Sequence, residues 1–182
     1  AIIRSCDAVG VGNIIGVSSN KEKININLKS ASGSNNWIKL QIHESIKTLL
    51  KTLKEKNMKI FIANNNNKST DFRNVNFTEP CAIILGSELS GISDEATNFS
   101  NQEIMIPMCG MVESLNVSVA SAIILYEVQR QRKEAGLYNH LRLTNNEYKK
   151  LLFEFSYPEV ARVYKNKGKK YPNLDSDGHI IA

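Results

Sequence analysis

The chain has 182 residues, of which 42% are hydrophobic and 23% charged, and its formal net charge is +5. This composition is typical of a globular protein with a real core and excludes a disordered chain. The positive charge permits a polyanionic partner such as nucleic acid without requiring one. Since no apolar run approaches the roughly 20 residues that a membrane-spanning helix needs, we expect no membrane partner.

Three cysteines, Cys6, Cys81 and Cys109, lie far apart, and two of them border apolar runs. This odd number without regular spacing predicts buried free thiols in a reducing compartment, and therefore a cytoplasmic protein. No metal-ligand spacing joins the cysteines to the histidines, so we expect no metal. The chain begins at Ala1 inside an apolar segment that lacks a helix cap, which predicts an N-terminal truncation.

Apolar spacing divides most of the chain into alternating helices and strands. Residues 1–9 have helical spacing and are followed by Gly10, a residue that commonly ends helices. Strands are predicted at 13–18, 37–42, 59–63, 81–85 and 103–107, with polar loops at 21–36 and 64–67. Further helices are predicted from residue 44, from the cap Ser93, and over 117–135. The alternation and the apolar strands predict an α/β fold with helices on both faces of a largely parallel sheet.

The last third of the chain differs in character. Thr144 and Glu147 have the spacing of a capping box before a helix, and Pro158 opens a second helix that ends by Gly168. The second helix leads into a basic run, which is either a phosphate-binding surface or an ordinary solvated face; its members are Arg162, Lys165, Lys167, Lys169 and Lys170. We therefore expect one domain over 1–137 and a helical, basic extension over 138–182.

Two polar loops follow apolar strands. The first, G-S-E-L-S-G at 86–91, lies where open α/β sheets bind ligands, although a tight turn with an exposed carboxylate is the simpler alternative. The second, V-E-S-L-N-V-S at 112–118, leads into the apolar helix, for which Ser114 and Asn116 are good cap residues. Polar groups beside a buried helix need partners from the fold or from a ligand.

Three segments occur in a fixed order along the chain: A-I-I-R-S-C-D-A-V-G-V at 1–11, A-I-I-L-G-S-E-L-S-G-I at 82–92 and I-P-M-C-G-M-V-E-S-L-N-V-S-V-A at 106–120. In this order they resemble the three motifs of the SpoU/TrmH family of SPOUT methyltransferases. The similarity continues through Y-E-V-Q-R-Q-R at 126–132 and Y-P-E-V-A-R-V-Y-K-N-K-G at 157–168. The long C-terminal extension favours the members that methylate tRNA over those that act on ribosomal RNA.

The resemblance implies a fold and an activity that periodicity does not reveal. The α/β core would contain a deep C-terminal trefoil knot, S-adenosylmethionine would bind bent within it, and a homodimer would complete the site. The reaction would be methyl transfer to the ribose 2′-hydroxyl of guanosine 18 in the tRNA D-loop. Two alternatives remain open: a ribosomal RNA 2′-O-methyltransferase of the same family, and a non-catalytic RNA-binding module on the same fold.

The resemblance also assigns roles to residues. Arg4 matches the motif-one arginine, which would hold substrate phosphate and stabilise the developing alkoxide; its alternative is a solvated helix arginine. Glu88, Ser114 and Asn116 match the remaining catalytic positions, and all three would also contact the cofactor. Other cofactor contacts are expected at Leu85, Gly86, Ile106, Met108 and Leu115. RNA contacts are expected at Arg130, Arg132, Arg162, Lys165 and Lys167; for the first two, an ordinary charged helix end is the alternative.

Overall fold

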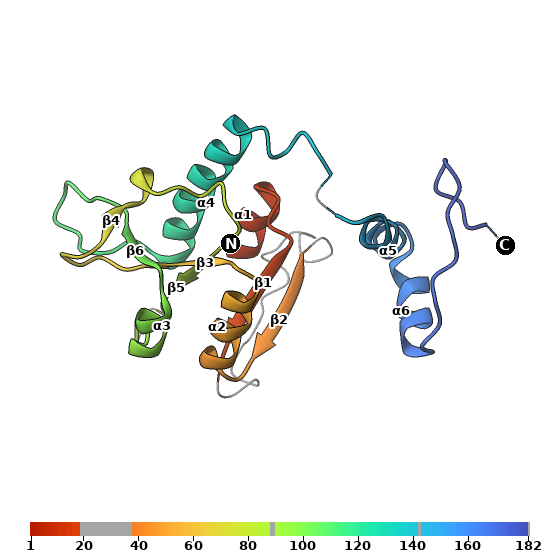
Figure 1. Cartoon of the computed structure of the whole chain (residues 1–182), viewed down its shortest axis with the longest axis horizontal. Coiled ribbons are helices and arrows are strands. Elements are labelled where there is room, and N and C mark those ends of the chain that lie inside the picture. Colours follow the sequence, from red (N-terminus) through yellow and green to blue (C-terminus); the bar gives the residue numbers. More distant parts are fainter. Residues whose placement is uncertain (19–37, 88–89, 142, 182) are drawn as a thin grey trace. The chain divides into compact units, whose positions relative to one another are not determined.

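The computed structural model describes residues 1–18, 38–87, 90–141 and 143–181. The predicted loop at 21–36, the predicted strand's first residue Trp37, and Glu88 therefore lie outside the described residues. The chain divides into two compact units, Ala1–Tyr138 and Asn139–Ala182 (Figure 1). The first unit contains all the strands named below, and the second contains the last two helices.

The described strands of the first unit form two parallel sheets, where the sequence predicted one. β1 (Asn13–Val17) pairs with β2 (Lys39–His43) in a sheet of its own. The other sheet has the order β4-β6-β3-β5 and every pairing in it is parallel. Its strands are β3 (Lys59–Ala63), β4 (Thr70–Asp71), β5 (Cys81–Leu85) and β6 (Gln102–Met105). Side-chain packing joins the sheets, because Ile14 of β1 and Ile83 of β5 pack on the same buried cluster.

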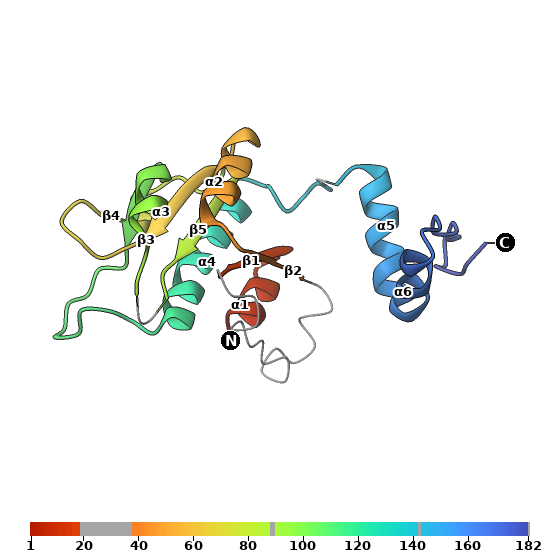
Figure 2. The same cartoon turned by 90° about the horizontal axis from the view of Figure 1, so that it is seen from below.

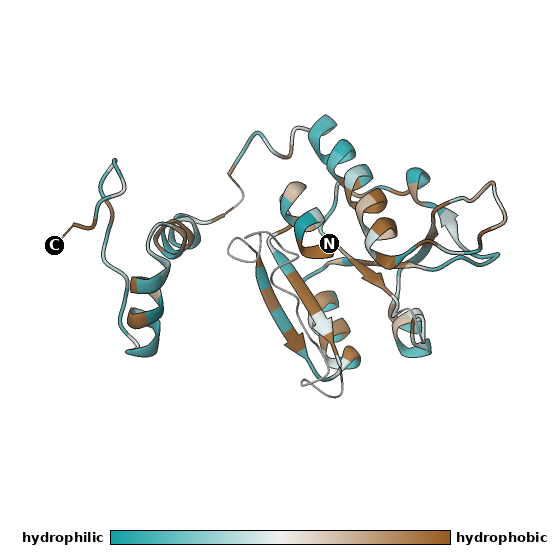
Figure 3. Cartoon of the chain, turned by 180° about the vertical axis from the view of Figure 1, so that it is seen from behind, coloured by the Kyte–Doolittle hydropathy of each residue, from teal (hydrophilic) through white to brown (hydrophobic). Residues whose placement is uncertain are grey.

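The helices of the first unit begin and end close to where the sequence predicts them. They are α1 (Ile2–Ala8), α2 (Ile46–Glu55), α3 (Asp94–Phe99) and α4 (Val117–Glu134). Ser45 and Ser93 cap α2 and α3 by accepting backbone hydrogen bonds, and Gly10 follows α1 with a φ of +77° that glycine adopts without strain. Figure 3 shows α4 changing from apolar near its start to hydrophilic at its C-terminal end.

Helices cover both faces of the four-stranded sheet, as predicted. Phe61 of β3 belongs to the buried cluster that includes Ile124 and Val128 of α4. Its neighbour Ile60 faces the other way and packs with Leu50 of α2 and with α3. Since successive side chains of a strand point to opposite faces, one strand supports both layers. Figure 2 shows α2 and α3 on one side of β3 and β5, with α4 on the other.

Other details of this unit also differ from the prediction. The short strand β4 and the 3₁₀ turn η4 (Phe72–Asn74) have no counterpart in the sequence analysis, because two residues are too few to show periodicity. The strand expected at 103–107 ends at Met105. Pro107 lacks the backbone N–H that a ladder needs and disfavours a regular pairing at this end.

The second unit contains α5 (Asn145–Ser156) and α6 (Pro158–Asn166), and the capping box of Thr144 and Glu147 is formed. Phe153 is 1% exposed and lies at the centre of an aromatic cluster. Its ring centroid is 4.7 Å from that of Tyr171 and 5.5 Å from that of Tyr157. This cluster is the apolar centre of the unit.

The three cysteines are free, but only Cys6 is buried; Cys81 is partly buried and Cys109 is exposed. The expectation of buried thiols is therefore wrong for Cys109, which lies in an exposed part of the loop after β6. Burial raises the pKa of the Cys6 thiol to about 11. Among the described residues, no helix is both long and apolar enough to cross a membrane.

Candidate cofactor-binding site

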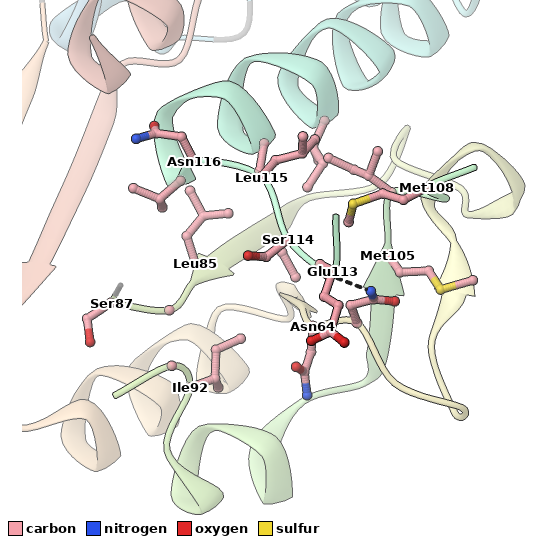
Figure 4. A pocket seen from close by; sticks show the side chains of 18 residues that line it. Asn64, Leu85, Ser87, Ile92, Met105, Met108, Glu113, Ser114, Leu115 and Asn116 are labelled. Atoms are coloured by element: carbon pink, nitrogen blue, oxygen red, sulfur yellow. Dashed lines mark hydrogen bonds between the residues drawn. The ribbon is translucent and has the colours of Figure 1, made fainter. Parts of the chain in front are cut away.

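Three loops of the first unit meet at one edge of the four-stranded sheet. β3 lies between β5 and β6, so the chain leaves these three parallel strands at neighbouring points. The loops and the start of α4 enclose a cavity of about 740 Å³ (Figure 4). This is the edge where open α/β sheets bind ligands, and the volume falls within the range of about 300–1,000 Å³ usual for such sites.

Seven of the eight residues predicted to contact the cofactor line this cavity; they are Leu85, Gly86, Ile106, Met108, Ser114, Leu115 and Asn116. The eighth, Glu88, lies outside the described residues. The structure therefore brings residues of two separate motifs into one wall. Cofactor contact by each of them stays a prediction.

The loop after β5 closes on itself through its two glycines. The backbone N–H of Ser87 donates to the carbonyl of Gly91 at 3.1 Å, and the N–H of Gly91 donates back to Ser87 at 2.9 Å. A Cβ atom at Gly86 would lie 2.6 Å from the carbonyl carbon of Gly91, and Gly91 has a φ of +63°. Ser87 and Gly91 are therefore paired and both line the cavity, whereas the carboxylate of the alternative interpretation, Glu88, lies outside the described residues.

The loop before α4 carries the most polar part of the wall. Asn116 is the helix cap, and its Oδ1 accepts hydrogen bonds from the backbone N–H of Ser118 at 2.8 Å and from the Ser118 hydroxyl at 2.6 Å. Ser114, the other predicted cap residue, is exposed beside Glu113 (Figure 4). Capping thus explains Asn116 in part and does not explain Ser114.

The asparagine loop after β3 also lines the cavity, which the sequence analysis did not foresee. The Asn65 side-chain amide donates to the backbone carbonyl of Glu113 at 3.0 Å and so ties the two loops together. The Asn64 amide donates to the Glu103 carboxylate at 3.0 Å. A run of four asparagines directly after a buried strand is the pattern that could have indicated this contribution.

The charge of the wall suits a positively charged sulfonium ligand. The described lining contains no lysine or arginine, and Glu113 supplies a carboxylate. Apolar side chains such as Leu85, Ile92 and Leu115 supply the remaining surface, as expected around a nucleoside. The residues present therefore fit S-adenosylmethionine.

Arg4 is exposed on α1 and is absent from the described lining of this cavity. The structure of one chain therefore does not bring the predicted catalytic arginine to the predicted cofactor residues.

The two arginines near the end of α4 are both engaged within the first unit. The Arg130 guanidinium pairs with Glu127 at 2.7 Å and Glu134 at 2.6 Å, and this hydrogen bonding holds the pKa of Glu127 below its ordinary value. Arg132 donates to the backbone carbonyl of Phe77 at 2.9 Å and to that of Glu79 at 3.1 Å. RNA contact by either residue stays a prediction.

Gln131, between these arginines, has a structural role that the sequence analysis missed. Its side-chain amide donates to the carbonyl of Val75 and accepts from the N–H of Phe77, both at 2.9 Å. Together with Arg132 it fastens the segment before β5 to α4, because side-chain groups replace the missing backbone partners of that segment.

In the second unit, Arg162 pairs with Glu159 at 2.6 Å, and Lys165 and Lys167 are exposed. Residues 175–179, with the sequence D-S-D-G-H, form a turn in which the Asp175 carboxylate accepts from the backbone N–H groups of Asp177 and His179. The metal-ligating atoms of these three exposed residues lie within 4.8 Å of one another. Exposed acidic groups of this kind are common without a metal.

Comparisons with known proteins agree with these motifs. Residues 1–126 match the SpoU rRNA Methylase family, and residues 130–182 match the family described as SpoU, rRNA methylase, C-terminal. The tRNA (guanosine(18)-2′-O)-methyltransferase of Escherichia coli K12 is 43% identical over 184 positions, which cover 100% of this chain and 80% of that protein.

Solved structures share the fold. The Aquifex aeolicus TrmH/SpoU tRNA modifying enzyme has a TM-score of 0.81 and 38% identity, over 87% of this chain and 81% of that one. The SpoU methyltransferase AviRb of Streptomyces viridochromogenes, solved in complex with the cofactor AdoMet, has a TM-score of 0.66 and 25% identity, over 73% of this chain and 55% of that one. On these matches, the chain belongs to the SpoU methylase family.

Proposed function

We propose that this protein transfers a methyl group from S-adenosylmethionine to the ribose 2′-hydroxyl of guanosine 18 in the D-loop of tRNA. The observation that carries the proposal is the 43% identity along the full chain to an enzyme named for this reaction. The cavity supports it, because its described lining combines apolar side chains with one carboxylate and no basic group.

The wall of the cavity would hold the cofactor. S-adenosylmethionine supplies an activated methyl group on a cationic sulfur. The backbone around Leu85 and Gly86 and the side chains of Met108 and Leu115 would hold its nucleoside, while Ser114 and Asn116 would shape the polar end. The protein's main contribution is then to place the ribose hydroxyl in line with the methyl carbon.

Arg4 would act on the ribose from a second copy of the chain. A guanidinium is a poor proton acceptor, so its role is to hold a phosphate and to stabilise the oxygen that loses its proton. A homodimer is supported by apolar side chains on α4, where Val119 and Tyr126 are 46% and 53% exposed and lie two helical turns apart. Exposed apolar side chains at this spacing suit an interface between copies.

The same proposal includes the domain bounds, the knot and the cellular location. The methyltransferase domain comprises residues 1–137, with its C-terminal part threaded as a trefoil knot, and residues 138–182 form an extension. The similarity to the Aquifex TrmH/SpoU structure supports the threading. A tRNA substrate favours the cytoplasm as the place of action.

The test is methyl transfer from labelled S-adenosylmethionine to an unmodified tRNA transcript, with the product nucleoside mapped by mass spectrometry. We expect 2′-O-methylguanosine at position 18. Arg4→Ala should lower the rate by at least about 100-fold while cofactor affinity is kept, since such electrostatic contacts contribute about 10²–10³-fold. Lys47→Ala, which removes an exposed charge from α2, serves as the control.

Other outcomes would point to the alternatives. Methylation of ribosomal RNA but not of tRNA would show that ribosomal RNA is the substrate. Ribosomal RNA is included in the test because the matching family is described as an rRNA methylase. RNA binding without cofactor binding would indicate a non-catalytic module. A monomer in sedimentation at micromolar concentration would refute the shared site.

A further inference from the structure

Four lysines of the second unit line one cavity of about 310 Å³. Lys150 comes from α5, Lys165 from α6, and Lys169 and Lys170 from the segment that follows α6. Glu154 and Tyr171 complete the charged and aromatic parts of its wall. The lysines are thus gathered from three parts of the chain, which a sequence run alone does not show.

A glycine turn after α6 brings the lysines together. Gly168 has a φ of +62°, and its backbone N–H donates to the carbonyl of Lys165 at 3.1 Å. The N–H of Lys169 donates to the carbonyl of Tyr164 at 3.0 Å, so the chain turns back directly after the helix. This is a common way to end a helix, and here it places Lys169 and Lys170 beside Lys165.

The aromatic cluster around Phe153 holds the segment that follows the glycine turn. Tyr171 stacks on the buried ring of Phe153 with a centroid distance of 4.7 Å and an angle of 20° between the planes. Its hydroxyl donates to the Glu154 carboxylate at 2.9 Å. The backbone that carries Lys169 and Lys170 is therefore held against α5 by packing and by a hydrogen bond.

The cavity has more positive charge than its own groups neutralise. Its lining sets four ammonium groups against one carboxylate, and Glu154 already accepts the Tyr171 hydroxyl. In the described part of the chain, none of the four lysines forms an ion pair, whereas Arg162 on the same helix pairs with Glu159 at 2.6 Å. Gathered ammonium groups repel one another, and a bound anion would relieve that repulsion.

We propose that this cavity binds a backbone phosphate of tRNA, with Lys150, Lys165, Lys169 and Lys170 as its ligands. The inference rests on the proposed function, since tRNA supplies the phosphate, and it shifts the expected contact away from Arg162. Lysine ammonium groups suit phosphate as point charges and read no base. The cavity therefore contributes to affinity and to the register of the tRNA, and leaves the choice of nucleotide to the methyltransferase domain.

The test measures tRNA binding by the full-length protein at several salt concentrations. Lys165→Gln and Lys169→Gln should each weaken binding of a tRNA transcript by roughly tenfold and lower the slope of log affinity against log salt by about 1. Lys149→Gln is the matched control, because it removes the same charge from an exposed neighbour of Lys150 that does not line the cavity.

Thermal unfolding and S-adenosylmethionine binding should match the wild type in every variant, since all the substituted residues are exposed. The inference is overturned if Lys149→Gln weakens tRNA binding as much as the lining variants, or if the lining variants bind normally. If the lining variants methylate tRNA normally and bind it as tightly as the wild type does, the phosphate site in this cavity is refuted and the proposed function stands. Loss of binding in the lining variants of a protein that does not methylate tRNA would support the cavity and refute the proposed function.

Discussion

The basic ends of α4 and α6 look alike in the sequence but differ in the structure. The arginines of α4 are engaged within the fold, Arg130 by two carboxylates and Arg132 by two backbone carbonyls. Lys165 and Lys169, at and beyond the end of α6, are exposed and line a cavity with two further lysines. A basic helix end therefore indicates a nucleic-acid contact only after its partners within the chain are known.

The chemistry of the two side chains explains the difference. The guanidinium of Arg132 presents several donors in a fixed plane, which suits the neighbouring carbonyls of Phe77 and Glu79. An ammonium on a flexible stem satisfies its donors in water and remains available to a partner. The first arrangement stabilises the fold, and the second leaves charge for a ligand.

Removing the aromatic support of the lysine cavity should have the largest effect. Phe153→Ala should lower the free energy of unfolding of the second unit by about 3–5 kcal/mol, because Phe153 is almost fully buried among tyrosine rings. Urea unfolding followed by tyrosine circular dichroism measures this change. The affinity for tRNA should fall with it, because Lys169 and Lys170 lose the packing that places them.

Phe155→Ala is the matched control, because Phe155 lies on the same helix and is 37% exposed. It should cost less than half as much free energy of unfolding as Phe153→Ala. Affinity for S-adenosylmethionine should be unchanged in both variants, since the cavity that would bind it belongs to the first unit. Equal effects of the two substitutions would show that the aromatic cluster does not support the second unit.

The fastening role of Arg132 should give the next largest effect. Arg132→Met keeps the aliphatic length but leaves two carbonyls without their donor, so we expect a loss of about 2 kcal/mol in the free energy of unfolding. Arg130→Met should cost less than about 1 kcal/mol, because the Arg130 and Glu134 side chains are exposed and Glu127, which is 11% exposed, keeps the Gln131 amide as a donor. Chemical denaturation of both variants compares them.

Binding of tRNA separates the two roles further. If Arg132 only fastens the chain, the folded Arg132→Met variant should bind a tRNA transcript with wild-type affinity and an unchanged salt slope. A lower slope would show that the residue contacts phosphate as well. The basic residues at the ends of α4 and α6 would then both contact phosphate and would differ only in how strongly they do so.

The smallest expected effect concerns the start of α5. Hydrogen bonds from Thr144 hold the pKa of Glu147 below its ordinary value of about 4.5. The folded state therefore favours the ionised carboxylate. The stability that this carboxylate contributes is fully present above the pKa of Glu147 in the unfolded chain, and it is lost as the pH falls through the lower pKa of Glu147 in the folded protein. Glu147→Gln should reduce the acid dependence of stability below about pH 4.5. A nuclear magnetic resonance titration of Glu147 and thermal unfolding at pH 3–7 would check this.

Most elements of the fold were predictable because their signals are local. Strands β3 and β5 have the predicted bounds, and the caps Ser93 and Thr144 act where the spacing placed them. The division of the strands into two sheets was not predictable, since apolar spacing marks a strand without naming its neighbour. Strand β4 was missed because two residues are too few to show the alternation of apolar and polar side chains that marks a strand.

The candidate site divides in the same way. Gly86, Ser114 and Asn116 were predicted from their motifs, and the structure places all three on one cavity. Asn65 was missed, because its contribution depends on a carbonyl 48 residues away in the chain. Arg4 was predicted by resemblance, and its role stays a prediction, because it is exposed on α1 and absent from the described lining of the cavity.

The sequence by itself determined which segments become helices and strands, which family the motifs resemble and where the basic residues are concentrated. These follow from local spacing and from ordered motifs. Only the tertiary structure decided which polar side chains meet. It joined the loops after β3, β5 and β6 at one sheet edge, turned Arg132 onto the carbonyls of Phe77 and Glu79, and gathered Lys150 beside Lys169. Such contacts depend on strand order and chain reversal, and residue spacing along the chain does not record either.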